Sequence, residues 1–137
     1  MNATDLMIGD WVKYESQHEM VSEIYNAGIY VRGLMGDENK GYPFEHLEPI
    51  MLTGEILEKN GFELIEVCDN GLATPKANIN RYEKWKCKTN KTFYVYYDRR
   101  SKEYSLTAFL TYISNILYVH ELQHALRMCG IEKEIEL

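Results

Sequence analysis

Cysteine, proline and long apolar runs are all scarce in this chain of 137 residues. The three cysteines, Cys68, Cys87 and Cys129, form no Cys-x-x-Cys pair and leave one over in any pairing, which favours reduced thiols over a disulfide framework. No run of about 18 apolar residues occurs, and the N-terminus lacks the basic start and apolar segment of a secretory signal. These absences predict a cytoplasmic location without a membrane anchor.

Basic residues are scarce at the start of the chain. Residues 1–50 hold three Lys or Arg against nine Asp or Glu, which accounts for the whole net charge of −6. Residues 76–102, by contrast, hold nine basic residues against Glu83 and Asp98 alone. An acidic N-terminal part therefore precedes a basic central part, and an overall pI near 5.2 conceals both.

Short alternating segments separated by turn residues dominate residues 1–51. Within residues 6–14 a Gly-Asp turn leads into a strand, and further strands are expected at 18–25 and 29–32, with a turn at 26–28. A glycine-containing loop at 33–41 precedes a short turn and one closing strand within 42–50. Several short strands within about fifty residues are typical of a small SH3-like β-barrel. We therefore predict such a barrel as the first subdomain.

Residues 52–137 predict two helices around an antiparallel β-meander. Thr53 is placed to cap a helix that ends at Gly61, and a second helix is expected from Tyr118 to Gly130. Between them, strands are expected at 62–67, 82–88, 92–97 and 103–109. Residues 107–115 fit either an extension of the last strand or the start of a long helix, and we favour a strand followed by a break at Ser114-Asn115 that caps the last helix. The predicted fold class is α+β: an SH3-like barrel (1–51) and an α-β-β-β-β-α subdomain (52–137), packed as one body.

The last helix contains His120-Glu121-Leu122-Gln123-His124, which matches His-Glu-x-x-His. In that motif, two histidines one helical turn apart bind zinc and the glutamate acts as general base. If the zinc interpretation holds, His120 and His124 are the metal ligands, Glu121 is the catalytic base, and the protein is a zinc-dependent hydrolase.

The position of the motif in its helix argues against zinc. On a helical wheel, an apolar stripe centred on Leu122 occupies one face, and His120 and His124 fall on the opposite side. Both histidines are therefore expected on a solvent-exposed face. A zinc site also needs a third protein ligand, and the sequence places no histidine after His124. We predict no metal, no cofactor and no catalytic residue.

Two surfaces are candidates for binding. On the predicted barrel, Trp11 and Tyr42 lead a set of aromatic residues that could contact a protein. On the meander, alternation places Lys84, Lys86 and Lys88 on one face, with Arg99 and Arg100 in the following turn. Lysines that neutralise phosphates beside aromatics that stack on bases are typical of single-stranded nucleic-acid binding.

Three segments in order, LMIGDWVKYE, EPIMLTGEILEKNGFE and YVHELQHAL, resemble a group of small proteins from Bacteroides-type bacteria and their phages or mobile elements. The group shows LRIGNWV, PIPLTEEILLKNGF and YVHQLQNLYFALTGEEL at these places, with Asn at the position of His124 and often Gln at that of Glu121. The resemblance implies cytoplasmic expression from a bacterial or phage genome and a packing role for the last helix. It carries no established activity.

The function expected from sequence is that of a non-enzymatic binding or accessory protein with an unknown protein partner. The alternatives are nucleic-acid binding by the basic sheet and, less favoured, zinc-dependent hydrolysis. No glycine-rich phosphate loop or nucleophile elbow occurs in the sequence.

Overall fold

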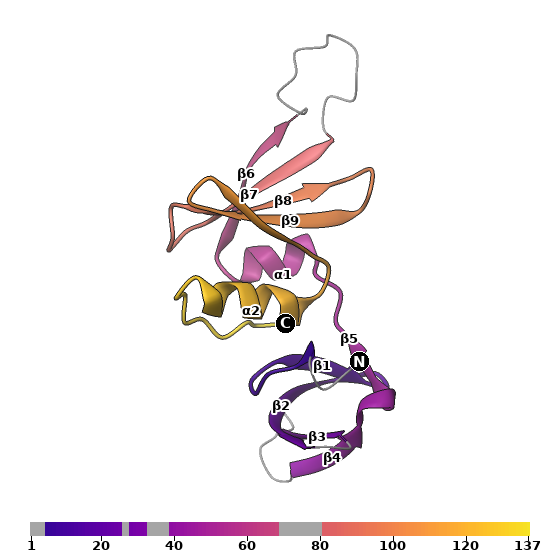
Figure 1. Cartoon of the computed structure of the whole chain (residues 1–137). Helices are drawn as coiled ribbons and strands as arrows, with labels where there is room; N and C mark the ends of the chain where they lie inside the picture. The colour runs from indigo at the N-terminus through magenta and orange to yellow at the C-terminus, as the bar shows by residue number, and fades with distance from the viewer. Residues whose placement is uncertain (1–4, 26–27, 33–38, 69–80) are drawn as a thin grey trace. The chain divides into compact units, whose positions relative to one another are not determined.

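The chain folds into two compact units, each built on a five-stranded antiparallel sheet (Figure 1). The computed structural model describes residues 5–25, 28–32, 39–68 and 81–137. The first unit comprises Met1–Met51 with Tyr118–Glu134, and the second comprises Leu52–Leu117 with Ile135–Leu137. The α+β class is therefore confirmed. The division of the chain into subdomains 1–51 and 52–137 stays a prediction.

The first sheet has the strand order β4-β3-β2-β1-β5. A 3-10 helix, η2, at Phe44–His46 leads directly into the last strand. The strands of the first sheet are β1 (Trp11–Tyr14), β2 (Gln17–Tyr25), β3 (Gly28–Arg32), β4 (Asn39–Pro43) and β5 (Leu47–Pro49). The helix α2 (Val119–Met128) belongs to the same unit.

The first sheet curls around a small apolar core. Its buried members are Leu6, Val12, Val21, Ile29 and Leu47. Tyr14 of β1 and Tyr42 of β4 stack with 3.9 Å between ring centroids, although two strands separate β1 from β4 in the sheet. The curl therefore brings the side chains of non-neighbouring strands together. The sheet is nevertheless open, because β4 and β5 are its two edges, and the predicted closed barrel is not seen.

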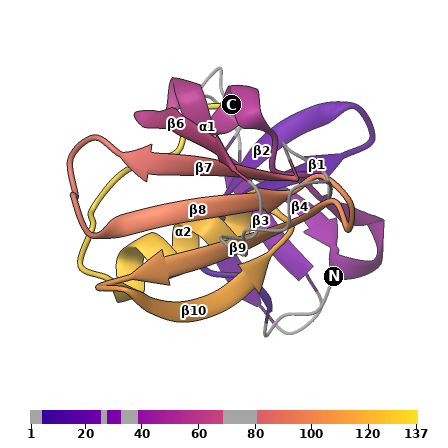
Figure 2. The same ribbon diagram turned by 90° about the horizontal axis from the view of Figure 1, so that it is seen from above.

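The second sheet is a meander in which each strand pairs with the next, in the order β10-β9-β8-β7-β6 (Figure 2). Trp85, Phe93, Val95 and Leu106 are buried, and alternate residues of the same strands are only partly covered. The elements are α1 (Gly54–Lys59), β6 (Phe62–Cys68), β7 (Tyr82–Cys87), β8 (Phe93–Asp98), β9 (Glu103–Ala108) and β10 (Thr111–Ile116).

Helix α1 begins and ends where the sequence predicts. The Thr53 hydroxyl accepts a hydrogen bond from the backbone N–H of Ile56 at 3.3 Å, which satisfies one of the unpaired donors of the first turn. Gly61 has φ +77°, a left-handed conformation that glycine adopts without steric cost. Directly afterwards, Phe62 is buried and its ring contacts that of Phe93. The cap and the turn therefore place the first strand of the second sheet.

Two predictions about local structure were wrong. Residues 39–41, assigned to the loop, belong to β4, because their backbone pairs with β3 despite a sequence that has no strand pattern. The expected break at Ser114-Asn115 is instead part of β10, and the chain reverses earlier, at Phe109-Leu110. The predicted turn at 26–27 and the loops at 33–38 and 69–80 lie outside the described residues.

Among the described residues, none of the helices has both the length and the apolar character that a bilayer crossing requires.

Candidate functional site

The histidines of the His-Glu-x-x-His segment are not on a solvent-exposed face. His120 is only 6% exposed and His124 is partly buried, so the sequence-based prediction of two exposed side chains was wrong. The prediction from the helical wheel assumed that only the apolar stripe of α2 is buried. The helix buries Leu122 and Leu126 as predicted, but it also buries His120 and Gln123.

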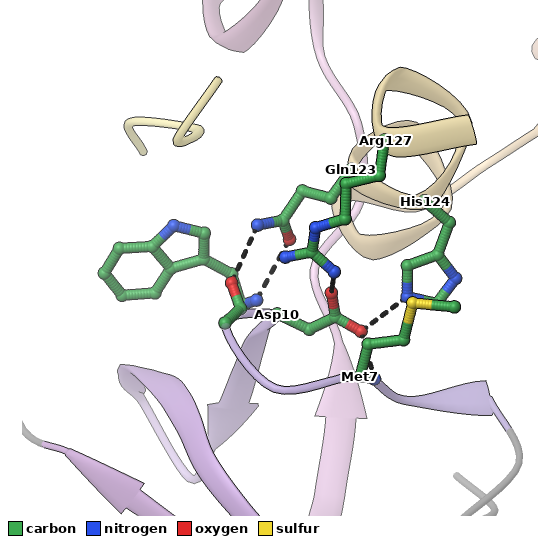
Figure 3. Close-up of polar contacts among 7 residues, drawn as sticks. Met7, Asp10, Gln123, His124 and Arg127 are labelled. Carbon is green, nitrogen blue, oxygen red and sulfur yellow. Dashed lines mark hydrogen bonds and ion pairs between the residues drawn. The ribbon is translucent and has the colours of Figure 1, made fainter. Parts of the chain in front are cut away.

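His124 and Arg127 both bind the carboxylate of Asp10, which is fully buried (Figure 3). The Nε2 atom of His124 lies 2.6 Å from Oδ2 of Asp10, and Arg127 donates to Oδ1 at 2.9 Å. The backbone N–H of Met7 donates to Oδ2 at 2.7 Å. Since a buried carboxylate is stable only when charged or polar donors surround it, these three donors explain how Asp10 is accommodated.

Gln123 binds the backbone on either side of Asp10. Its Nε2 donates to the carbonyl of Gly9 at 2.9 Å, and its Oε1 accepts from the backbone N–H of Trp11 at 3.1 Å. Both groups of the side-chain amide are therefore paired with the segment that enters β1 (Figure 3). Because buried backbone groups without partners are costly, these two hydrogen bonds favour the position of α2 against this segment.

Glu121 holds the start of α2. Its Oε2 accepts from the backbone N–H of Tyr118 at 3.0 Å, and Glu121 is the third residue of the helix, where a carboxylate also interacts favourably with the helix dipole. The residue that would serve as general base in a zinc hydrolase thus takes part in capping the helix.

His120 lies in a small cavity at this end of the helix. The cavity has a volume of about 310 Å³ and is lined by Asp5, Pro49, Tyr118, His120, Glu121 and His124. Burial is the main cause that lowers the pKa of His120 below its ordinary value, so its imidazole is neutral near pH 7. Among the described residues, its Nδ1 has no hydrogen-bond partner. Its ring lies parallel to that of Tyr118 and edge-on to that of His124.

The described part of the chain contains no group of three His, Cys, Asp or Glu side chains placed to hold a metal ion. Asp10 does approach His124, but there it accepts from two further donors. The geometry therefore assigns Gln123, His124 and Glu121 to bonds within the first unit.

The lysine row predicted from alternation is only partly exposed. Lys84 and Lys86 are half-buried and Lys88 is exposed. The ammonium group of Lys84 lies 4.9 Å from the ring centroid of Tyr94 and 5.7 Å from that of Tyr96, as in a cation–π contact. On the neighbouring strand β6, Glu66 lies opposite Lys84 in the strand register and Glu63 lies opposite Lys86. Carboxylates therefore lie directly beside this basic row.

The arginines near the lysine row are mostly paired with carboxylates. Arg99 binds Glu83 through two of its nitrogens, at 2.9 and 3.0 Å. Arg81 forms a similar two-nitrogen pair with Asp98, and these hydrogen bonds hold the pKa of Asp98 well below its usual range. Arg100 is exposed. Of the five basic residues predicted to bind, Arg99 is thus engaged within the unit and Lys84 covers tyrosine rings.

The aromatic residues of the first unit separate into buried and exposed sets. Trp11 is 6% exposed and belongs to the core, and Tyr42 is half-buried against Tyr14. Burial, and then the nearby Glu19 carboxylate, raise the pKa of Tyr42. Tyr25 and Tyr30 are each 39% exposed. The surface-accessible tyrosines are thus a different pair from the residues that sequence reasoning placed first.

Sequence reasoning missed Asp10, Gln123 and Arg127 as one cluster. The available signal was a charged residue directly before the apolar Trp11-Val12, together with two polar residues on a helix that otherwise repeats apolar positions. Neither signal indicates that the entry to β1 contacts α2, because these two segments are more than a hundred residues apart in the sequence.

No family model, curated protein or solved structure matches this chain. The resemblance to Bacteroides-type proteins therefore stays a prediction.

Proposed function

We propose that the protein is a non-enzymatic binding protein whose first unit captures a segment of another protein on a tyrosine-bearing, acidic surface. The observation that carries the proposal is the exposed pair Tyr25 and Tyr30, whose ring centroids are 5.0 Å apart. Exposed tyrosines supply a large, stiff contact area with a polar tip, and they are enriched in protein interfaces.

Gly41 helps to shape this surface. The two tyrosines alternate with Ile24 and Ile29, so they lie on the side of the sheet away from the core. A Cβ added at Gly41 would lie 3.3 Å from the Tyr30 ring and 3.4 Å from the Tyr25 hydroxyl. Glycine at this position therefore lets both rings lie close over β4, where they form one continuous patch.

The fold of the first unit supports a binding role by analogy. An SH3-like fold has a meander whose last strand follows a 3-10 helix and returns to pair with the first strand. Here η2 precedes β5, β5 pairs with β1, and the stacked Tyr14 and Tyr42 mark the curl of the sheet. We therefore propose an SH3-like relationship with an unclosed sheet. Because many functions share one fold, this analogy supports a binding role without naming a ligand.

Charge indicates the chemistry of the partner. Residues 1–50 carry a net charge of −6, and Glu23, directly opposite Tyr30 on the neighbouring strand, is exposed. A positively charged segment would approach this surface faster and dock with complementary charge. We therefore propose that the captured segment contains lysine or arginine together with an apolar or aromatic residue.

The non-enzymatic part of the proposal is supported by the role of α2. The polar side chains Glu121, Gln123 and His124 each bind groups within the first unit, and Asp10 is fully buried. A catalytic group must instead reach the reacting atoms of a substrate.

A library of random peptides displayed on phage provides the test. The wild-type protein should enrich peptides with basic and aromatic residues, and a synthetic copy of an enriched peptide should bind less tightly as salt is added. The double variant Tyr25→Ser/Tyr30→Ser should lose this binding. Tyr112→Ser, which changes an exposed tyrosine of the second unit, should retain it. Failure to enrich any peptide, or unchanged binding to the double variant, would contradict the proposal.

A further inference from the structure

One of the four sheet edges lacks the features that normally protect an edge strand. Edge strands expose backbone donors and acceptors, and natural proteins discourage pairing there with charged residues or proline. Three of the described edge strands follow this rule, since β4 contains Lys40 and Pro43, β5 contains Glu48 and Pro49, and β6 contains Glu63 and Glu66. The fourth, β10, reads TYISNI and has neither charge nor proline.

The β10 edge is also exposed and apolar. Tyr112 is 58% exposed and Ile113 is 38% exposed. At the turn before β10, Phe109 is 72% exposed and Leu110 is 96% exposed. Large apolar side chains gathered at an exposed edge are typical of an interaction surface.

The turn itself is unusual. Ala108 pairs with Thr111, so Phe109 and Leu110 are the two central residues of a tight hairpin, and their φ angles are +53° and +65°. Asparagine and glycine are the residues that normally take these positions. Bulky residues in left-handed conformations persist mainly at functional positions. The sequence thus keeps two apolar side chains at a strained turn and presents them to solvent.

We propose that β10 pairs with β10 of a second copy of this chain, antiparallel and about a two-fold axis, to join two second sheets into one. This inference goes beyond the proposed function, because it concerns a different surface on the second unit. An antiparallel strand pair related by a two-fold axis is self-complementary, so a single strand serves both partners. In a chain with net charge −6, an uncharged edge is where two copies can approach without like-charge repulsion.

Pairing through β10 gives a closed dimer and not a fibre. The joined sheet would have β6 at both ends, and β6 carries Glu63 and Glu66. A third copy would bring like charges together at either end, and this discourages further growth. When the pairing is centred on β10, the turn of each copy lies beside the residues that follow Ile116 in the other. Phe109 and Leu110 would then be covered by the partner.

A pair of matched substitutions tests the proposal. Ile113 and Ile65 are both partly exposed isoleucines at register shifts in edge strands, Ile113 in β10 and Ile65 in β6. Ile113→Lys places a charge beside its counterpart in the second copy and should weaken dimerisation by about tenfold or more. Ile65→Lys, on the opposite edge, should leave dimerisation within about twofold of wild type, because exposed substitutions away from an interface change little.

Sedimentation equilibrium over a concentration series provides the readout. Wild type and Ile65→Lys should reach twice the 16.1 kDa mass of one chain, while Ile113→Lys should stay near 16.1 kDa. Circular dichroism should show the same folded signal for all three. A wild-type protein that remains monomeric up to the highest attainable concentration would overturn the proposal. So would a dimer that persists in Ile113→Lys and is lost in Ile65→Lys.

Hydrogen exchange on the wild-type protein needs no variant and covers the case in which Ile113→Lys does not fold. Amides of residues 111–116 should become more protected as the protein concentration rises, and those of 62–68 should not change. Concentration-dependent protection confined to the first unit, or to β6, would assign the dimer contact elsewhere and overturn the role of β10.

Discussion

The Oδ2 atom of Asp10 lies 2.6 Å from Nε2 of His124, although 114 positions separate the two residues in the chain. Arg127 binds the other carboxylate oxygen of the same residue. This contact explains a polar residue directly before the apolar start of β1, and it explains the second histidine of a segment that resembles a zinc motif. The helix α2 and the entry to β1 are therefore held together by polar contacts.

Asp10→Ala should destabilise the first unit by roughly 2–4 kcal/mol, because it removes a buried carboxylate and leaves the N–H of Met7 without its partner. Urea unfolding followed by circular dichroism measures the change. Glu48→Ala is the control, since Glu48 also pairs with a basic residue, Lys13, but is exposed. It should cost less than about 1 kcal/mol. Equal effects of the two substitutions would refute the structural role of Asp10.

Stability should fall on mild acidification because of His120. Burial lowers its pKa below the ordinary 6.5, so between these two values the unfolded chain binds a proton that the folded chain does not. The contribution of neutral His120 to the free energy of unfolding is therefore complete above about pH 6.5. It is lost as the pH falls toward the pKa of His120 in the folded protein. Urea unfolding at about pH 7.5 and about pH 5.5 covers this range while carboxylates, which titrate near 4, remain charged.

His120→Phe isolates this effect. The variant keeps a ring beside Tyr118 but cannot take up a proton. Its stability should change less between the two pH values than that of wild type. His18→Gln, which changes an exposed histidine, should lose as much stability between the two pH values as the wild-type protein does. An identical pH dependence in wild type and His120→Phe would show that another group is responsible.

How much of this structure the sequence could predict depends on whether the signal was local. The two ends of helix α1 could be predicted because Thr53 and Gly61 act within one turn of them. The two faces of β7 followed from alternation, which places Lys84, Lys86 and Lys88 on the face opposite the buried Trp85. These signals involve a few neighbouring residues, and tertiary contacts did not override them.

The misses arose where distant contacts decide the outcome. The wheel treated His120 and His124 as solvent-facing because the partner of His124, Asp10, lies at the other end of the chain. The hairpin at Phe109-Leu110 was missed because its residues are not turn formers, and only the pairing of β9 with β10 places them there. For the candidate site, residue types indicated possible chemistry, but the partners decided which groups stay available.

Single-stranded nucleic acid should bind weakly through the central sheet. Lys84 lies over Tyr94 and Tyr96, and Glu63 and Glu66 are directly opposite the lysines, so few groups remain to neutralise phosphates. Anisotropy of a labelled oligonucleotide at low salt should show no saturation at micromolar protein. Saturable binding that weakens steeply with salt and disappears in Lys84→Ala/Lys86→Ala/Lys88→Ala would reverse this conclusion and favour the nucleic-acid alternative.

Replacing the strained turn should stabilise the second unit. Phe109→Asn/Leu110→Gly supplies the residues that left-handed turn positions favour, and it should raise the free energy of unfolding by roughly 1–3 kcal/mol, since each left-handed bulky residue costs about 1–2 kcal/mol. Phe109→Ala/Leu110→Ala is the matched control, because alanine removes the exposed apolar groups but keeps the unfavourable backbone angles. It should not give this gain. Denaturant unfolding of the three proteins, at a concentration where each is monomeric, separates strain from apolar exposure. A gain of the same size in both variants would show that exposure of the Phe109 and Leu110 side chains, and not backbone strain, limits stability at this turn.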